Sequence, residues 1–195
     1  MPVRVLASLC VCLVLVACGH TPIMSIYKLS QLDAATVDIA ALRAAVLVPA
    51  ALRPREVTLH LSANKPGGAT SRRESFLLQP VDEPDELRLL VHEAVSGSRH
   101  YIFRIAPTDV ARAQRFHDGM AADRAASGRK ERGSLSIAAK ACRAGRLPRG
   151  SLLLTTYLKF EPGGAYVPLA RDVDLGSYVD EKTLREKIPV CGTQP

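Results

Sequence analysis

Tryptophan is absent from this 195-residue sequence, and aromatic residues together make up only 5% of it. A binding site built from stacked aromatic rings, as for nucleobases or many sugars, is therefore not expected. The sequence also contains only one long apolar run, which excludes a protein with several membrane-spanning helices. Hydrophobic residues nevertheless account for 47% of the chain, too many for a mostly disordered protein. Length and composition together predict one globular domain of ordinary size.

The one long apolar run covers residues 5–17 and follows Arg4. It is shorter than the roughly 20 residues that a helix needs to cross a bilayer. The run ends in the letters LVAC, with the cysteine at Cys18. A basic start, a short apolar core, a small residue and a cysteine, in this order and spacing, resemble the lipobox signal peptide of bacterial lipoproteins. The alternatives are an ordinary signal peptide cut nearby and an uncleaved anchor.

The resemblance to bacterial lipoproteins ends at the cysteine, but it implies an organisation for the whole chain. Residues 1–17 would be removed as a signal peptide, and Cys18 would become the first residue and carry the lipid. Two or three acyl chains hold a protein on a membrane far more firmly than one. Gly19 stands where aspartate favours the inner membrane in the proteobacterial pattern, so the resemblance implies a periplasm-facing, outer-membrane location. We expect residues 18–37 to link this anchor to a single domain over 38–195.

Five cysteines are present, and the lipoprotein resemblance accounts for three of them. Cys10 and Cys12 would leave with the signal peptide, and Cys18 would take the lipid. Cys142 and Cys191 remain, and the cell envelope is an oxidising compartment, so we predict a disulfide between them. A bridge over a loop of about 50 residues contributes roughly 4 kcal/mol in the loop-entropy model. The alternative, a reactive thiol or a metal ligand, is less favoured because neither cysteine has a histidine or cysteine at metal-ligand spacing.

Three segments have the spacing of apolar residues that is typical of helices. Residues 38–48 are alanine-rich, begin with an aspartate that can cap a helix and stop before a proline, which predicts a short helix. Residues 108–127 form the longest candidate, with Thr108 as its cap and Gly128 at its end. Residues 180–188 predict a short terminal helix.

The remaining apolar segments alternate or are rich in strand-forming residues. Strands are predicted over residues 56–62, 75–81, 87–95, 100–105, 134–142, 151–160 and 165–169. The segment 87–95 also suits a helix, but a strand is favoured because it would complete a hairpin with 100–105. Pro168 argues for an edge position of the last strand. Because strands follow strands through short turns, the predicted fold is α+β, with a mainly antiparallel sheet, one long and two short helices and one disulfide.

Positive charge is concentrated in residues 99–149, which hold 12 of the 26 lysines and arginines of the chain. This segment is the candidate contact face for an anionic lipid or polymer of the envelope. The residues proposed to bind such a ligand are Arg124, Arg129, Lys130, Arg132, Arg143, Arg146 and Arg149. The alternative is a solvated, arginine-rich surface without a ligand. Nucleic acid is not expected as a partner, because the compartment is wrong and no nucleic-acid motif is present.

Residues capable of catalysis are scattered and match no known catalytic spacing. The histidines considered are His60, His92, His100 and His117, and the carboxylates are Asp82, Glu83, Asp85, Glu86, Asp172 and Asp174. No metal and no cofactor are expected, since no two histidines have the spacing of zinc ligands. The leading hypothesis is a non-enzymatic, membrane-anchored binding module that contacts an envelope protein, a lipid or an anionic polymer. The alternatives are an envelope hydrolase with a scattered His/Asp site and a structural lipoprotein that bridges envelope layers.

Overall fold

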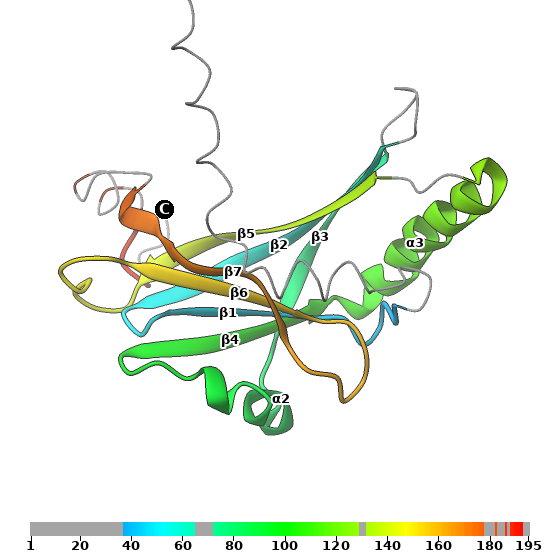
Figure 1. Cartoon of the computed structure of the whole chain (residues 1–195). Coiled ribbons are helices and arrows are strands. Elements are labelled where there is room, and N and C mark those ends of the chain that lie inside the picture. The colour runs from blue at the N-terminus through cyan, green and yellow to red at the C-terminus, as the bar shows by residue number, and fades with distance from the viewer. Residues whose placement is uncertain are drawn as a thin grey trace, which may run out of the picture.

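A curled, antiparallel sheet of seven strands dominates the structure, which is a computed structural model (Figure 1). It describes residues 37–64, 72–128, 132–177, 182, 186 and 188–192. The strands are β1 (Arg43–Pro49), β2 (Leu52–Asn64), β3 (Arg72–Val81), β4 (Ser98–Ile105), β5 (Arg132–Arg143), β6 (Leu153–Lys159) and β7 (Val167–Asp174). Their order across the sheet is β5-β2-β3-β4-β1-β6-β7. The curvature brings the two halves of the sheet toward each other, so that the sheet forms a half-barrel.

The prediction of an α+β fold with three helices is wrong, because the described chain is largely β. Its two α-helices are α2 (Pro84–Arg88) and α3 (Pro107–Ser127), and two short 3-10 turns are η2 (Val91–Glu93) and η3 (Leu175–Ser177). The predicted helix over 180–188 lies largely outside the described residues.

The predicted helix over 38–48 is instead a turn followed by β1, a central strand of the sheet. Asp38 does accept hydrogen bonds from the backbone nitrogens of Ala40 and Ala41, at 2.9 and 3.2 Å, but it closes a turn rather than a helix. Six consecutive residues of β1 are buried, because both faces of this strand are covered. A strand buried on both faces is continuously apolar and therefore lacks the alternation that identifies a strand.

The predicted strand over 87–95 is also wrong. This segment contains the end of α2 and the turn η2, and together they lie against the convex face of the sheet (Figure 1). Leu90 is the one large apolar side chain of the segment that is buried, whereas Leu87, Leu89, Val91 and Val95 are exposed. The expected hairpin with β4 does not form, because β4 pairs with β1 and β3 instead.

Other local predictions are confirmed. The helix predicted over 108–127 is α3, and Gly128 ends it with a φ of 63°, in the left-handed region that favours glycine. Thr108 is not the cap, since Ala106 holds that position and Pro107 begins the helix. β6 and β7 form the predicted hairpin, and β7, which contains Pro168, lies at an edge of the sheet.

The two faces of the sheet carry different cores, and alternate residues of β1 show the division. Ala44, Val46 and Val48 belong to the larger apolar core on the concave face. Ala45 and Leu47 belong to a smaller core on the convex face, beneath the segment that contains α2 and η2. This alternation follows from the two-residue period of a strand.

The chain near the C-terminus is attached to the end of β5. The sulfur atoms of Cys142 and Cys191 lie 2.05 Å apart, so this pair is a disulfide candidate. The backbone nitrogen of Arg143 donates a hydrogen bond to Pro189 (2.8 Å), and Cys191 donates one to Arg143 (2.9 Å). These contacts hold residues 188–191 beside the concave face of the sheet.

Candidate functional site

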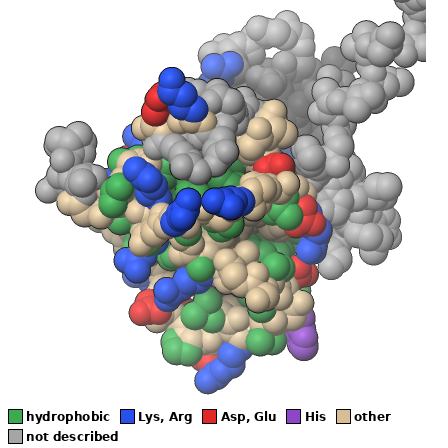
Figure 2. All heavy atoms as spheres, turned by 90° about the vertical axis from the view of Figure 1, so that its left-hand side faces the viewer, with side chains coloured by type: hydrophobic (Ala, Val, Ile, Leu, Met, Phe, Trp, Pro, Cys, Tyr) green, Lys and Arg blue, Asp and Glu red, His purple; other side chains and the backbone are tan. Residues whose placement is uncertain are grey.

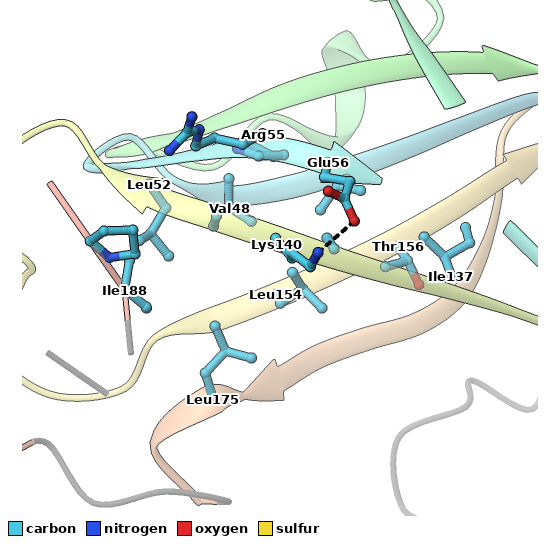
Figure 3. Close-up of a pocket in the computed structure, with 15 residues that line it drawn as sticks. Val48, Leu52, Arg55, Glu56, Ile137, Lys140, Leu154, Thr156, Leu175 and Ile188 are labelled. Atoms are coloured by element: carbon cyan, nitrogen blue, oxygen red, sulfur yellow. Dashed lines mark ion pairs between the residues drawn. The ribbon is translucent and has the colours of Figure 1, made fainter. Parts of the chain in front are cut away.

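An apolar groove of about 820 Å³ lies in the concave face of the half-barrel. Its lining includes Val46 and Val48 of β1, Leu154 of β6, and Ile137 and Ala139 of β5. Residues of β2, η3 and the segment at 188–189 complete the walls. Figure 3 shows these side chains arriving from strands far apart in the sequence. The volume is within the range of sites that hold a small organic ligand, roughly 300–1,000 Å³.

The groove exists because large side chains and α3 cover the concave face at one end, whereas small side chains line it at the other. At one end, Ala113 of α3 is fully buried in the concave core, together with Ile39 and Leu42. At the other end, β5 contributes Ala139 and Ala141 to the lining. These two alanines follow larger side chains on the same strand and face, and their small volume leaves open space between β5 and the opposite strands.

A bulge in β2 changes the direction of the strand where it forms the wall of the groove. The pairing with β5 shifts between Pro54 and Glu56, so Arg55 is an extra residue without a cross-strand partner. Proline at a bulge is expected because it has no backbone N–H to donate. Arg55 is exposed and lines the groove. In Figure 3 it lies toward the end of the groove where Leu52 and Ile188 are found.

Glu56 and Lys140, which also line the groove, neutralise each other. They are directly paired across β2 and β5, and their charged atoms are 2.8 Å apart (Figure 3). The side chain of Lys140 is 77% exposed, so this is a solvated ion pair of the kind that contributes about 0–1 kcal/mol. Among the described residues of the lining, the pair leaves Arg55 as the one charge without an ion-pair partner.

Arg143 lies at the same end of the groove and on the same face. It is the cross-strand partner of Leu52, which lines the groove, and paired residues of a sheet share a face. The Nε atom of Arg143 is buried and has no hydrogen-bond partner. A buried donor without a partner is unfavourable, although Arg143 is not itself one of the residues that line the groove.

The end of the molecule where Leu52 and Arg55 line the groove is strongly basic. We call it the basic end, and it comprises residues 49–56, 98–99, 140–153 and 174–177. Its basic residues are Arg53, Arg55, Arg99, Lys140, Arg143, Arg146 and Arg149, against the acidic Glu56 and Asp174. Asp174 is engaged by the backbone nitrogens of Leu152 and Gly176, at 3.0 and 2.9 Å. Figure 2 views this end directly and shows lysine and arginine side chains bordering hydrophobic ones.

The structure brings together only part of the basic set predicted from residues 99–149. Arg143, Arg146 and Arg149 belong to the basic end, whereas Arg124 is in the last turn of α3, which projects from the opposite end of the sheet (Figure 1). Four further predicted positions cannot be placed as side chains: Cys18, Arg129 and Lys130, which lie outside the described residues, and Arg132, whose backbone alone is described.

The convex face contains a buried ion pair that the sequence pattern did not indicate. Lys159 of β6 and Glu86 of α2 approach to 2.5 Å, with side chains only 4% and 10% exposed. The hydroxyl of Tyr166 donates a hydrogen bond to the second oxygen of Glu86 (2.8 Å). Burial raises the pKa of Glu86, but the hydrogen bonds from Lys159 and Tyr166 outweigh burial and hold the pKa below its usual range. The carboxylate therefore fastens α2 to the sheet.

A second, more exposed cluster fastens η2 to the same face. Arg171 donates two hydrogen bonds to Glu93, at 2.6 and 3.1 Å, and the Tyr157 hydroxyl donates a third at 3.2 Å. The hydrogen bond from Arg171 is the main cause of a lowered pKa of Glu93. The ring of His100 lies beside Tyr157, with centroids 5.9 Å apart, and burial lowers the pKa of His100 despite the nearby Glu93 charge. Glu93 and His100 therefore lie on the convex face, opposite the groove.

The histidines and carboxylates considered for catalysis do not converge on the groove. His60 is exposed on β2 and bonds to Ser75 (2.8 Å), while His92 belongs to η2 and His117 to α3. Asp172 has a φ of 55° and contacts Thr155 instead of pairing with the other aspartate of β7. Across the described ranges, no group of three His, Cys, Asp or Glu side chains is arranged to hold a metal ion.

Sequence reasoning missed the groove and both convex-face clusters. The signal for the groove was present in β5, where Leu135 and Ile137 are followed on the same face by Ala139 and Ala141. No sequence signal connects Glu86 to Lys159, which are far apart along the chain.

Comparison with known proteins gives no relative from which a function can be transferred. No protein-family model, no curated protein and no solved structure matches this chain. In the part of the chain that the structure describes, no helix is long and apolar enough to cross a membrane.

Proposed function

We propose that this protein is a membrane-anchored envelope lipoprotein that binds the acyl chain of a lipid in its groove without chemical conversion. The observation that carries the proposal is an apolar groove of about 820 Å³ on the concave face, with basic residues around one end of it. An apolar lining stabilises a bound acyl chain through burial from water, at about 0.8 kcal/mol per buried CH₂.

A lipid is favoured over the other two partners expected from the sequence. An anionic polymer is polar along its whole length and gains nothing from the groove between Val48 and Leu154. A protein partner with an acidic surface would pair with the basic end but would leave the apolar groove unfilled, whereas an acyl chain fills it. Anchoring through Cys18 would keep the groove close to the membrane that supplies the ligand.

The proposal is tested with the full chain reconstituted in phosphatidylcholine vesicles and irradiated with a photoreactive diazirine analogue of palmitate. We expect attachment to peptides that contain Ile137, Ala139 or Leu154, and we expect excess palmitate to prevent it. Mass spectrometry of the digested protein locates the attachment. Attachment confined to the convex face, or attachment that excess palmitate does not reduce, would contradict the proposal.

A further inference from the structure

We infer that the groove selects lipids with an anionic head group, which Arg55 and Arg143 bind at the basic end while the acyl chain lies in the groove. This inference rests on the proposed function, because it assumes that an acyl chain occupies the groove. It adds a chemical class of ligand, an orientation and two binding residues.

Arg55 is placed for this role by the bulge in β2. A regular strand would turn successive side chains to alternate faces, whereas the extra residue re-aims its own side chain at the rim. The described residues place no carboxylate within ion-pair distance of the Arg55 guanidinium, which distinguishes it from Lys140 with its partner Glu56. An arginine at the mouth of an apolar groove, without a protein partner, is available to a ligand anion.

Arg143 supplies the second donor. Its position opposite Leu52 puts it on the concave face, one step beyond Ala141 along β5. Its buried Nε atom lacks any hydrogen-bond partner, and no carboxylate of the described residues forms an ion pair with it. A guanidinium presents a planar set of N–H donors that matches a carboxylate or a phosphate, so a bound acidic head group would satisfy this orphaned donor.

The charge of the surroundings favours the same ligand. The basic end contains seven basic residues and only two acidic ones. Both acidic side chains already have partners, since Glu56 forms an ion pair with Lys140 and Asp174 accepts hydrogen bonds from backbone nitrogens. The resulting positive potential attracts an anionic head group and repels a cationic one. The combination of an apolar interior and a basic mouth therefore orients an acidic amphiphile with its tail inward.

The test compares three photoreactive diazirine probes that share a hexadecyl tail: hexadecyl phosphate, hexadecanol and hexadecyltrimethylammonium. Each probe is added to the full chain in neutral phosphatidylcholine vesicles, and attachment to groove peptides is quantified. We expect the phosphate probe to attach about tenfold more than the cationic probe, with the alcohol between them. In the double variant Arg55→Gln/Arg143→Gln, attachment of the phosphate probe is expected to fall to the level of the alcohol.

Arg73→Gln/Arg115→Gln is the matched control, because both arginines are exposed, on β3 and α3, outside the groove lining, and their replacement removes the same two charges. It is expected to leave all three probes unchanged. Equal attachment of the three probes to the wild-type groove would overturn the head-group inference and leave the proposed function standing. Failure of every probe to attach in the groove would overturn the proposed function and this inference with it. The comparison of probes on the wild-type chain decides the head-group preference even if the double variant fails to fold, and a folded double variant that keeps the preference for the phosphate probe would overturn the assignment to Arg55 and Arg143.

Discussion

Replacement of Ala139 by tryptophan is expected to lower acyl binding at least about tenfold, which is a loss of roughly 1.4 kcal/mol or more of binding free energy. The methyl group of Ala139 lines the groove between β5 and the strands opposite it. An indole at this position would occupy the space that the acyl chain needs. Photolabelling of the full chain in phosphatidylcholine vesicles by the palmitate analogue provides the measurement.

Ala138→Trp is the matched control for this prediction. Ala138 precedes Ala139 on the same strand, is also exposed to solvent, and points to the opposite face of the sheet because strand side chains alternate. The same indole on that face is expected to leave acyl attachment unchanged. Equal losses in the two variants would mean that tryptophan perturbs β5 itself, and an unaffected Ala139→Trp protein would mean that the ligand does not occupy the groove.

Lys159→Met is expected to lower the free energy of unfolding by about 3 kcal/mol, since it leaves a buried carboxylate without its main counter-charge. Glu86 keeps the hydroxyl of Tyr166 and an arginine, Arg43, whose Nε is 3.9 Å away. These remaining partners place the expected loss at the lower end of the range for broken buried ion pairs. Urea unfolding of the variant and the wild type gives the difference.

The control for this substitution is Lys140→Met, which removes the same side chain from an ion pair that is exposed. Its expected effect is within about 1 kcal/mol. Adding Glu86→Leu to Lys159→Met is expected to recover much of the lost stability, because it removes the unpaired charge. A loss as small for Lys159→Met as for Lys140→Met would show that the buried pair does not fasten α2.

The stability difference between Lys159→Met and the wild type should also depend on pH. In the wild type the pKa of Glu86 is lowered, so its contribution is complete above the unfolded pKa, near 4.5, and is lost as the pH falls through the folded pKa. In the variant the hydrogen bond from Lys159 is gone and burial still raises the pKa of Glu86, so protonation relieves the destabilisation. The difference in unfolding free energy should therefore narrow between pH 7 and pH 4.

Local sequence patterns correctly predicted the elements that depend on residues close together in the sequence. Residues 108–127 have helical spacing and a glycine at their end, and they form α3. The hairpin of β6 and β7 follows from two strand-forming segments around a Pro-Gly-Gly turn, and Pro168 correctly predicted an edge. Each of these signals depends on neighbours within a few residues.

The errors arose where distant contacts decide the structure. Residues 43–49 form a strand whose two faces are both covered, by the concave core on one side and the convex core on the other. Both sets of side chains are therefore apolar, and the alternating pattern that identifies a strand is missing. The segment 87–95 is not a strand, because two glutamates hold it against the face of the sheet. Glu86, just before the segment, is bound by Lys159, which lies 73 residues further along the chain. Glu93, within the segment, is bound by Arg171, which lies 78 residues further along. No local pattern contains such a contact.

The candidate site could be predicted only in part for the same reason. The positively charged segment 99–149 contains Arg143, which lies at the basic end, but it also contains Arg124, which lies at the other end of the sheet. Arg55 lay outside the predicted basic segment, and only the bulge in β2 places it at the groove. The lipid on Cys18 stays a prediction from the lipobox resemblance.

The occupancy of the groove by an acyl chain is tested most directly by tryptophan fluorescence, which has no background because the chain contains no tryptophan. Leu154→Trp puts a single indole in the groove wall, and because it replaces a side chain that is already large it fills far less of the groove than an indole at Ala139 does. Leu153→Trp puts the indole on the adjacent residue, which is 44% exposed. With the full chain in phosphatidylcholine vesicles, brominated palmitate is expected to quench the Leu154→Trp protein saturably and to leave the Leu153→Trp protein nearly unchanged. Equal quenching of the two proteins, or no quenching of Leu154→Trp, would contradict an acyl chain in the groove.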